Sequence, residues 1–174
     1  MFLTGDPGCG KTTVVRKLAE IFSNQGIRAG GVISGEIRRG VGRVGFSLED
    51  LLTHEVGILA HVEQIDGPQV GKYRVNLKDV ERVGAAAVRR AIAEADVIVV
   101  DELGPMELHS DAFVQTIETA LASVKNVIGT IHKRASHPLV LSIKSNSAYQ
   151  VLEVTVENRD NLPKTIADDL SRHG

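Results

Sequence analysis

The stretch Gly5-Asp6-Pro7-Gly8-Cys9-Gly10-Lys11-Thr12 decides the fold of this chain. It fits the pattern G-x-x-x-x-G-K-[ST] at every fixed position. A short apolar segment, Phe2-Leu3-Thr4, precedes it and an amphipathic segment follows, as the pattern requires. Glycines let such a loop curl so that successive N–H groups point inward, and the following helix adds its N-terminal dipole to the same anion site. The sequence therefore predicts a phosphate-binding loop.

The residues of this loop have different expected tasks. Lys11 is expected to place its charge at the β- and γ-phosphates of a nucleotide, and Thr12 to offer its hydroxyl to Mg²⁺. Cys9 occupies a position where any residue is allowed, so a small filler is a simpler interpretation than a catalytic thiol. The predicted nucleotide contacts in the loop are Gly5, Asp6, Pro7, Gly8, Cys9, Gly10, Lys11 and Thr12.

Amphipathic segments alternate with short apolar runs along the rest of the chain. The hydrophobic periodicity predicts helices over residues 11–25, 79–95, 111–121, 138–144 and 162–171, with Asp79 as an N-cap. Apolar runs predict strands at residues 2–4, 27–33, 58–62, 72–75, 97–100, 126–131 and 150–156, and a hairpin turn at 38–43 leads into a returning strand at 44–48. We therefore expect one α/β domain over residues 1–174, with a largely parallel sheet, helices on both faces and a small hairpin insertion.

A second motif follows the apolar run Val97-Ile98-Val99-Val100. Asp101 comes directly after this run, at the edge of the sheet where ligands bind, and is expected to hold Mg²⁺ beside Thr12. Glu102 is the next residue and could orient or deprotonate the water that attacks the γ-phosphate. Glu107 competes for that role, although an acid in the first turn of a helix is also an ordinary feature.

Arginine side chains could stabilise the charge that spreads over the γ-phosphoryl oxygens during transfer. Five candidates lie near expected strand ends or turns, and for any single one a solvated surface position is the more common situation. Arg134 is the preferred candidate, because it leaves a strand at the expected ligand edge. The others are Arg38, Arg39, Arg43 and Arg159.

The bulk properties limit the class of protein. The 174 residues are 43% hydrophobic and 24% charged, which is typical of one globular domain. A net charge of −2 gives no electrostatic basis for nucleic-acid binding. We find no apolar run of the ~18 residues that a membrane span needs, no signal-peptide pattern and no zinc-ligand spacing. With a single cysteine, these features predict a cytoplasmic protein.

The segment Asp101-Glu102-Leu103-Gly104-Pro105-Met106-Glu107-Leu108 resembles the D-E-[IL]-G-x-M-E-L signature of the small P-loop nucleoside-triphosphatases, the family of the thermophile and cancer-related nucleoside-triphosphatases. Other stretches, such as 70–76 and 158–160, also resemble that family, whereas residues 49–66 match it loosely. The resemblance implies a RecA-like fold, Mg²⁺-dependent hydrolysis of nucleoside triphosphates with broad base tolerance, and further nucleotide contacts at Asp101, Glu102, Leu103 and Gly104.

Three functions fit these patterns. The first is hydrolysis of ATP, GTP, CTP, UTP and similar nucleotides to the diphosphate and phosphate, with Lys11, Glu102 and Arg134 as catalytic residues. The second is a nucleotide or small-molecule kinase, for which the hairpin at 38–43 could serve as a short lid. The third is a nucleotide-dependent binding switch in which slow hydrolysis acts as a timer. Physiological substrate, oligomeric state and protein partners are open at this point.

Overall fold

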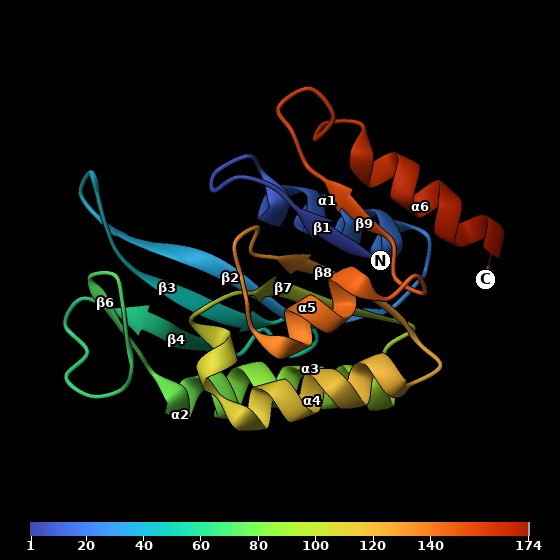
Figure 1. The fold of residues 1–174 in the computed structure, drawn as a ribbon. Coiled ribbons are helices and arrows are strands. Elements are labelled where there is room, and N and C mark those ends of the chain that lie inside the picture. The colour runs from blue at the N-terminus through green and yellow to red at the C-terminus, as the bar shows by residue number, and fades with distance from the viewer. Residues whose placement is uncertain (174) are drawn as a thin grey trace.

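A nine-stranded sheet runs through the molecule (Figure 1). The computed structural model describes the backbone of residues 1–173 and the side chains of residues 1–170. Five strands form the parallel part of the sheet, in the order β2 (Ala29–Arg39), β7 (Val97–Leu103), β8 (Asn126–Ile131), β1 (Phe2–Thr4) and β9 (Val151–Glu153). Four further strands extend it from β2 in antiparallel pairs, in the order β3 (Gly42–Asp50), β4 (Val56–His61), β6 (Tyr73–Val75) and β5 (Gln69–Val70).

The central strand β7 explains why both faces of the sheet are covered. Its apolar residues alternate between two hydrophobic clusters: Val97 and Val99 belong to one, and Ile98 and Val100 to the other. Side chains of successive strand residues point to opposite faces, so an uninterrupted apolar run needs a helix layer on each side. This is the arrangement that the run of β-branched residues predicts.

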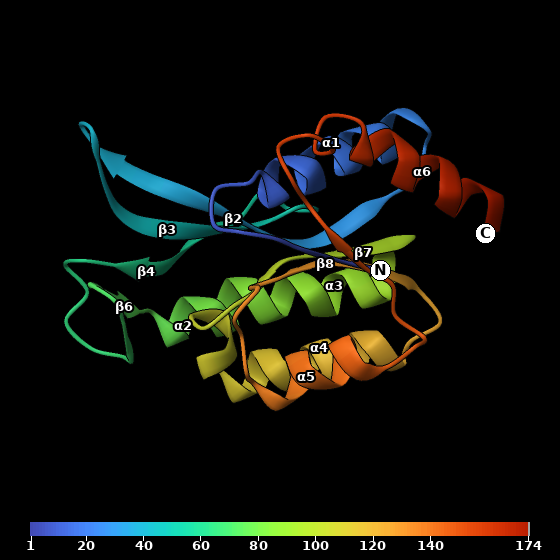
Figure 2. The same ribbon diagram turned by 45° about the horizontal axis from the view of Figure 1, so that its top comes forward.

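Two helix layers supply that cover (Figure 2). On one face α1 (Lys11–Asn24) and α6 (Leu162–His173) pack together, with Val14, Leu18 and Ile166 in the shared cluster. The other face carries α3 (Ala86–Glu94), α4 (Asp111–Ala122) and α5 (Pro138–Ser145). The fold is the predicted α/β architecture, with helices on both faces of a largely parallel sheet.

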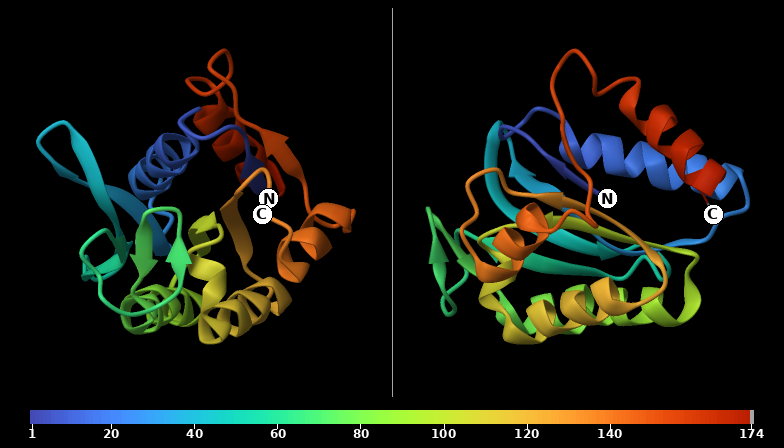
Figure 3. Two further views of the ribbon diagram at one scale, coloured as in Figure 1. Left: turned by 60° about the vertical axis from the view of Figure 1, so that its left-hand side comes forward. Right: turned by 45° about the vertical axis from the view of Figure 1, so that its right-hand side comes forward.

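The hairpin is longer than the pattern predicts and stands out from the body of the molecule (Figure 3). Strand β2 continues past the expected end at residue 33 to Arg39, and Gly40 then makes the turn with a φ of 58°. Strand β3 returns in antiparallel register, with Ser34 opposite Leu48 and Arg38 opposite Arg43. Cross-strand pairing therefore extends β2 through polar residues that have no strand periodicity of their own.

The helix predicted over residues 79–95 begins earlier and is irregular. A short turn α2 (Leu77–Asp79) starts it, a π-helical turn η1 (Val80–Ala85) follows, and α3 completes it. The prediction that Asp79 caps this segment was wrong. Asn76 is the cap, since its side chain accepts the Asp79 N–H at 3.2 Å, and the Asp79 carboxylate instead accepts the Ile58 N–H at 2.8 Å.

The carboxyl ends of β1, β2, β7 and β8 meet at one edge of the sheet, because these strands are parallel. The P-loop follows β1, and both acids of the second motif lie in β7. Within the part of the chain that the structure describes, no helix combines the length and apolar character needed to cross a membrane.

Candidate functional site

The P-loop links β1 to α1 in a conformation that depends on glycine. Gly8 and Gly10 have positive φ values of 79° and 111°. A Cβ on Gly5 would lie 2.6 Å from the Val154 carbonyl oxygen of the neighbouring strand segment, so only glycine fits there. Pro7, Gly8, Gly10, Lys11 and Thr12 line the adjoining cavity, whereas the exposed Asp6 carboxylate pairs with Lys133 at 3.2 Å.

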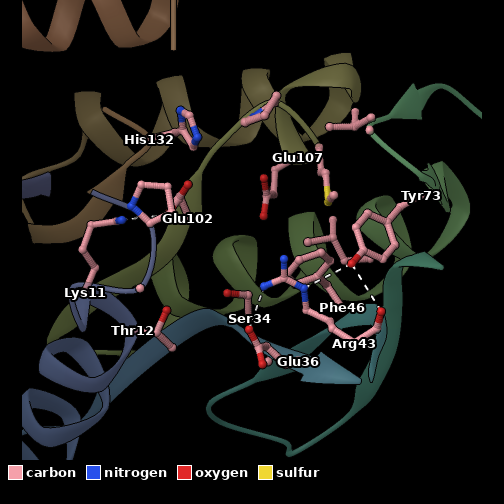
Figure 4. Close-up of a pocket in the computed structure, with 18 of the residues that line it drawn as sticks. Lys11, Thr12, Ser34, Glu36, Arg43, Phe46, Tyr73, Glu102, Glu107 and His132 are labelled. Atoms are coloured by element: carbon pink, nitrogen blue, oxygen red, sulfur yellow. Dashed lines mark hydrogen bonds and ion pairs between the residues drawn. The ribbon is translucent and has the colours of Figure 1, made fainter. Parts of the chain in front are cut away.

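Lys11 lies across this loop and is almost fully buried. Its Nζ donates to the carbonyl oxygens of Gly5 at 3.2 Å and Asp6 at 3.5 Å. The same Nζ lies 3.8 Å from Glu102 Oε2 (Figure 4). The ammonium group is thus held between the phosphate-binding loop and the acid that follows the buried strand.

Asp101 is 0% exposed and accepts hydrogen bonds from three hydroxyl groups. Thr12 Oγ1 donates to Oδ2 at 2.8 Å, Ser34 Oγ donates to the same oxygen at 3.0 Å, and Thr130 Oγ1 donates to Oδ1 at 2.6 Å. These donors come from α1, β2 and β8, so the tertiary fold fixes the carboxylate beside the Thr12 hydroxyl. Ser34 and Thr130 were not predicted, although the position of Thr130 near the end of β8 is a signal that could have found it.

Glu102 follows through a cis peptide bond and faces the cavity. Burial raises the pKa of its carboxyl, the nearby Lys11 ammonium lowers it, and the charge of Asp101 raises it further. The net direction is upward. A carboxylate in this position is close to Lys11 and open to the space where phosphate would lie.

Glu107 lies in a short 3-10 turn (Glu107–His109) and is 5% exposed. Its side chain lines the same cavity as Glu102. Burial raises the pKa of Glu107 to about 8, and the charges of Glu102 and Asp101 act in the same direction. At neutral pH this carboxyl is therefore mainly protonated and can donate a hydrogen bond.

His132 is a cavity residue that the sequence did not indicate. Burial lowers the pKa of its imidazole, and the positive charges of Lys11, Arg134 and Lys144 lower it further. Its Nδ1 accepts the Arg134 N–H at 3.3 Å, which leaves Nε2 to carry the proton of the neutral ring.

The five candidate arginines lie in different places. Arg43 lines the cavity, where it donates to Tyr73 Oη at 3.1 Å and pairs with Glu36 at 2.8 Å. Arg159 packs against the P-loop, and its guanidinium donates to the Cys9 carbonyl oxygen at 3.4 Å. Arg134 is exposed and is not among the described residues that line the cavity. Arg38 pairs with Glu36, and Arg39 with Glu63.

The remaining predicted contacts, Leu103 and Gly104, lie behind the cavity wall. The Leu103 side chain is 0% exposed in the hydrophobic core, and its carbonyl oxygen accepts the His132 N–H at 3.3 Å. A Cβ on Gly104 would lie 3.0 Å from Glu102 Oε1 and 3.1 Å from Glu107 Oε2, so glycine leaves room for both carboxyl groups.

A divalent cation fits this donor set. Mg²⁺ in nucleotide sites takes one or two protein oxygens together with phosphate oxygens and water. The adjacent oxygens of Thr12 and Asp101 provide such a pair. Among the described residues there is no cluster of three or more His, Cys, Asp and Glu side chains that could hold a metal ion by itself.

A phosphate-binding loop, a buried aspartate bonded to its threonine and a second acid facing its lysine define a P-loop nucleotide-binding protein. Comparison with protein families matches residues 1–167 to the family described as NTPase. The nucleoside-triphosphatases THEP1 of Thermofilum pendens and Methanosarcina acetivorans are 45% and 46% identical over 97% and 98% of this chain, and over 93% and 95% of their own lengths.

Solved structures agree with this relationship. THEP1 from Aquifex aeolicus superimposes with a TM-score of 0.86 at 33% identity, covering 98% of both chains. A human cancer-related nucleoside triphosphatase superimposes with a TM-score of 0.82 at 32% identity, covering 99% of this chain and 97% of its own. The chain belongs to the NTPase family, and it is an enzyme of that class.

Proposed function

We propose that this enzyme hydrolyses nucleoside triphosphates to the diphosphate and phosphate, that it depends on Mg²⁺ and that it accepts several bases. One observation carries the proposal: the buried Asp101 carboxylate accepts the Thr12 hydroxyl at 2.8 Å, while Lys11 Nζ lies 3.8 Å from Glu102. These contacts support a metal site at Thr12 and Asp101, a phosphate-binding role for Lys11 and a role for Glu102 in activating water.

Binding of the triphosphate begins in the loop. Backbone N–H groups of the loop, such as those of Gly8 and Gly10, and the N-terminus of α1 offer hydrogen bonds and a positive dipole to the phosphates. Lys11 exchanges its long contacts with the Gly5 and Asp6 carbonyl oxygens for the β- and γ-phosphates. Thr12 and Asp101 would hold Mg²⁺, which neutralises charge that develops on the phosphate oxygens.

Glu102 is the proposed base for the attacking water. It is the carboxylate nearest Lys11, so a water bound to it would lie beside the phosphoryl group that Lys11 holds. Glu107 is less suited to accept a proton at neutral pH, because burial keeps its own carboxyl protonated up to about pH 8. It is better suited to donate a hydrogen bond within the cavity.

For the arginine that stabilises the transition state we propose two candidates, Arg134 and Arg43. Arg134 is kept as the candidate from the sequence, but its exposed side chain would have to turn toward the cavity. Arg43 already lines the cavity. Replacing each by alanine separates the two, because loss of a charge that acts only in the transition state lowers kcat without weakening nucleotide binding.

Three wider expectations accompany this function. Residues 1–174 are proposed to act as a single domain, since both hydrophobic clusters pack on one sheet. Nucleoside triphosphates are the expected partners, and Leu103 and Gly104 the expected backbone neighbours of the nucleotide. A cytoplasmic location stays a prediction, and cell fractionation with an antibody to the chain tests it.

Steady-state phosphate release tests the proposal directly. It is measured with ATP, GTP, CTP, UTP and the diphosphates, each with and without Mg²⁺. Release from all four triphosphates that stops when the metal is removed is expected. Absence of release above background in every condition contradicts the proposed hydrolysis, and release from one base alone contradicts the broad specificity.

The role of Glu102 needs its own variant. Glu102→Gln keeps the size of the side chain and removes the base, so ATP binding should persist while phosphate release falls by at least ~100-fold. Glu157→Gln makes the same change on an exposed loop and should leave release unaltered. Wild-type turnover in Glu102→Gln would refute this assignment.

A further inference from the structure

His132 is a cavity residue whose side chain has no part in the hydrolysis proposed above. It follows β8 directly, and its half-buried ring lies on the side of the cavity where Lys11 and Glu102 also lie (Figure 4). Ligand sites place a small number of polar groups at defined points of their walls. A polar ring beside the phosphate-binding lysine is therefore a candidate for direct contact with the nucleotide.

Two hydrogen bonds place His132 between the ends of β1 and β7. The His132 N–H donates to the Leu103 carbonyl oxygen at 3.3 Å, at the end of β7. Thr4 Oγ1, at the end of β1, donates to the carbonyl oxygen of Ile131, the residue before His132, at 3.3 Å. The imidazole therefore extends from a backbone that is tied to both of these strands.

Lys11 lies between the same two strand ends. Its Nζ donates to the Gly5 carbonyl oxygen at 3.2 Å, directly after β1, and lies 3.8 Å from Glu102 Oε2 in β7. A γ-phosphate held by Lys11 would thus lie between the ends of β1 and β7, where His132 begins. Lys11 is also close enough for its positive charge to lower the pKa of the His132 imidazole.

The contacts of the His132 ring decide which nitrogen carries the proton. Nδ1 accepts the Arg134 N–H at 3.3 Å, so a proton on Nδ1 would face another donor. Burial holds the pKa of the ring below its ordinary value of 6.5, and the ring is therefore mainly neutral at neutral pH, with its proton on Nε2. Among the described residues Nε2 has no hydrogen-bond partner, which leaves this N–H available to a ligand.

The next two basic residues face elsewhere. Lys133 is exposed, and its Nζ pairs with Asp6 at 3.2 Å and with Glu153 at 2.8 Å. Arg134 is exposed and is not among the described residues that line the cavity. In the run 132–134 it is His132 that lines the cavity, so this segment presents a neutral N–H donor to the substrate rather than a full charge.

We propose that His132 is a further catalytic residue, whose Nε2–H donates a hydrogen bond to an oxygen of the γ-phosphoryl group. Negative charge spreads over these oxygens during phosphoryl transfer, and a donor that is already directed at them stabilises the transition state. A diphosphate has no γ-phosphoryl oxygen, so only a triphosphate makes this contact. The proposal rests on the proposed function, since it needs the same bound nucleoside triphosphate.

Two substitutions separate the nitrogens of the ring. In His132→Asn the amide oxygen can take the place of Nδ1 and still accept the Arg134 N–H, but the donor at Nε2 is lost. In His132→Gln the longer side chain carries an amide N–H to the place of Nε2. A hydrogen bond to a charged group contributes enough for its loss to lower kcat by about 10- to 100-fold in His132→Asn. His132→Gln should keep kcat within about threefold of wild type.

His137→Asn is the matched control. His137 Nδ1 also accepts a backbone N–H, that of Leu139 at 3.3 Å, but it caps α5 and is not among the described residues that line the cavity. Asparagine is a good N-cap, so this variant should keep its fold and its kcat. Phosphate release is measured at saturating ATP and Mg²⁺, and calorimetry measures the affinity for ADP, which should be unchanged in all three variants.

The possible outcomes are distinct. A low kcat in His132→Asn, its recovery in His132→Gln and unchanged ADP affinity together support the inference. Wild-type kcat in His132→Asn overturns it and leaves the proposed hydrolysis intact. Equal losses of kcat in both His132 variants, or a matching loss of ADP affinity, also overturn it, because the ring would then act only through the structure of its loop. Absence of phosphate release from the wild-type enzyme overturns the proposed function itself and the inference with it.

Discussion

Replacement of Glu107 by glutamine should change how the stability of this protein depends on pH. Glu107 is 5% exposed, and its pKa is about 8 in the folded protein against an ordinary value of 4.5. Between these two values the folded protein holds a proton that the unfolded chain has released. The stabilisation from this proton is complete below about pH 4.5 and is lost as the pH rises through about 8.

The size of the effect follows from the linkage between proton binding and folding. The free energy of unfolding should fall by about 1.4 kcal/mol for each pH unit within this window. From about pH 5 to about pH 8 the loss is on the order of 4 kcal/mol, and relaxation of the site would reduce it. Whole domains are stable by only ~5–15 kcal/mol, so a loss of this size is measurable.

Urea unfolding measures this effect without nucleotide or metal. The free energies of wild type and Glu107→Gln are compared at several pH values, and taking the difference cancels most contributions of the other carboxyl groups. The advantage of wild type over the variant should decline steadily as the pH rises. Glu118→Gln, on the exposed side of α4, is the matched control, and its difference from wild type should stay constant. Parallel curves for wild type and Glu107→Gln would refute the reasoning.

Three further predictions concern single positions. Cys9 is the only cysteine and lies in the P-loop, so its alkylation by iodoacetamide, followed by mass spectrometry, should slow when ATP is bound; equal rates would argue against nucleotide in this loop. Gly31→Ala should unfold the protein or cost well over ~3 kcal/mol in urea titrations, because its φ is +119° and a Cβ would lie 2.0 Å from the Val99 carbonyl oxygen. Gly26→Ala, with positive φ but open space, should cost only about 1 kcal/mol, and equal losses would contradict the steric argument. Thr130→Val removes the hydroxyl that donates to Asp101 at 2.6 Å and should cost ~1–3 kcal/mol; unchanged stability would show that this bond contributes little.

The regular core of the fold could be predicted from the sequence because its signals are local. The run at residues 97–100 alternates between two helix layers because it is apolar at every position. Helix α1 begins directly after the loop, as the motif requires. The antiparallel extension was harder to predict, since β2 beyond residue 33 is polar and becomes a strand by pairing with β3.

The candidate site also has one part that the sequence predicts and another part that only the structure shows. The motifs predicted a site at Lys11, Thr12, Asp101 and Glu102, and the fold brings these four side chains together at the ends of β1 and β7. Position along the chain favoured Arg134 over Arg43, whereas the structure places Arg43 in the cavity and leaves Arg134 exposed. Spacing from a strand end does not determine where a long side chain points.

The sequence by itself determined the glycine-rich loop between the first strand and helix, the buried acidic strand end and the alternation of helices and strands. Each of these depends on residues that are neighbours in the chain, so its physical basis can be read locally. Only the tertiary structure decided the three hydroxyl donors around Asp101, the raised pKa of Glu107 and the position of Arg43 in the cavity. These features arise from contacts between distant segments and from the exclusion of water, and no local pattern specifies either.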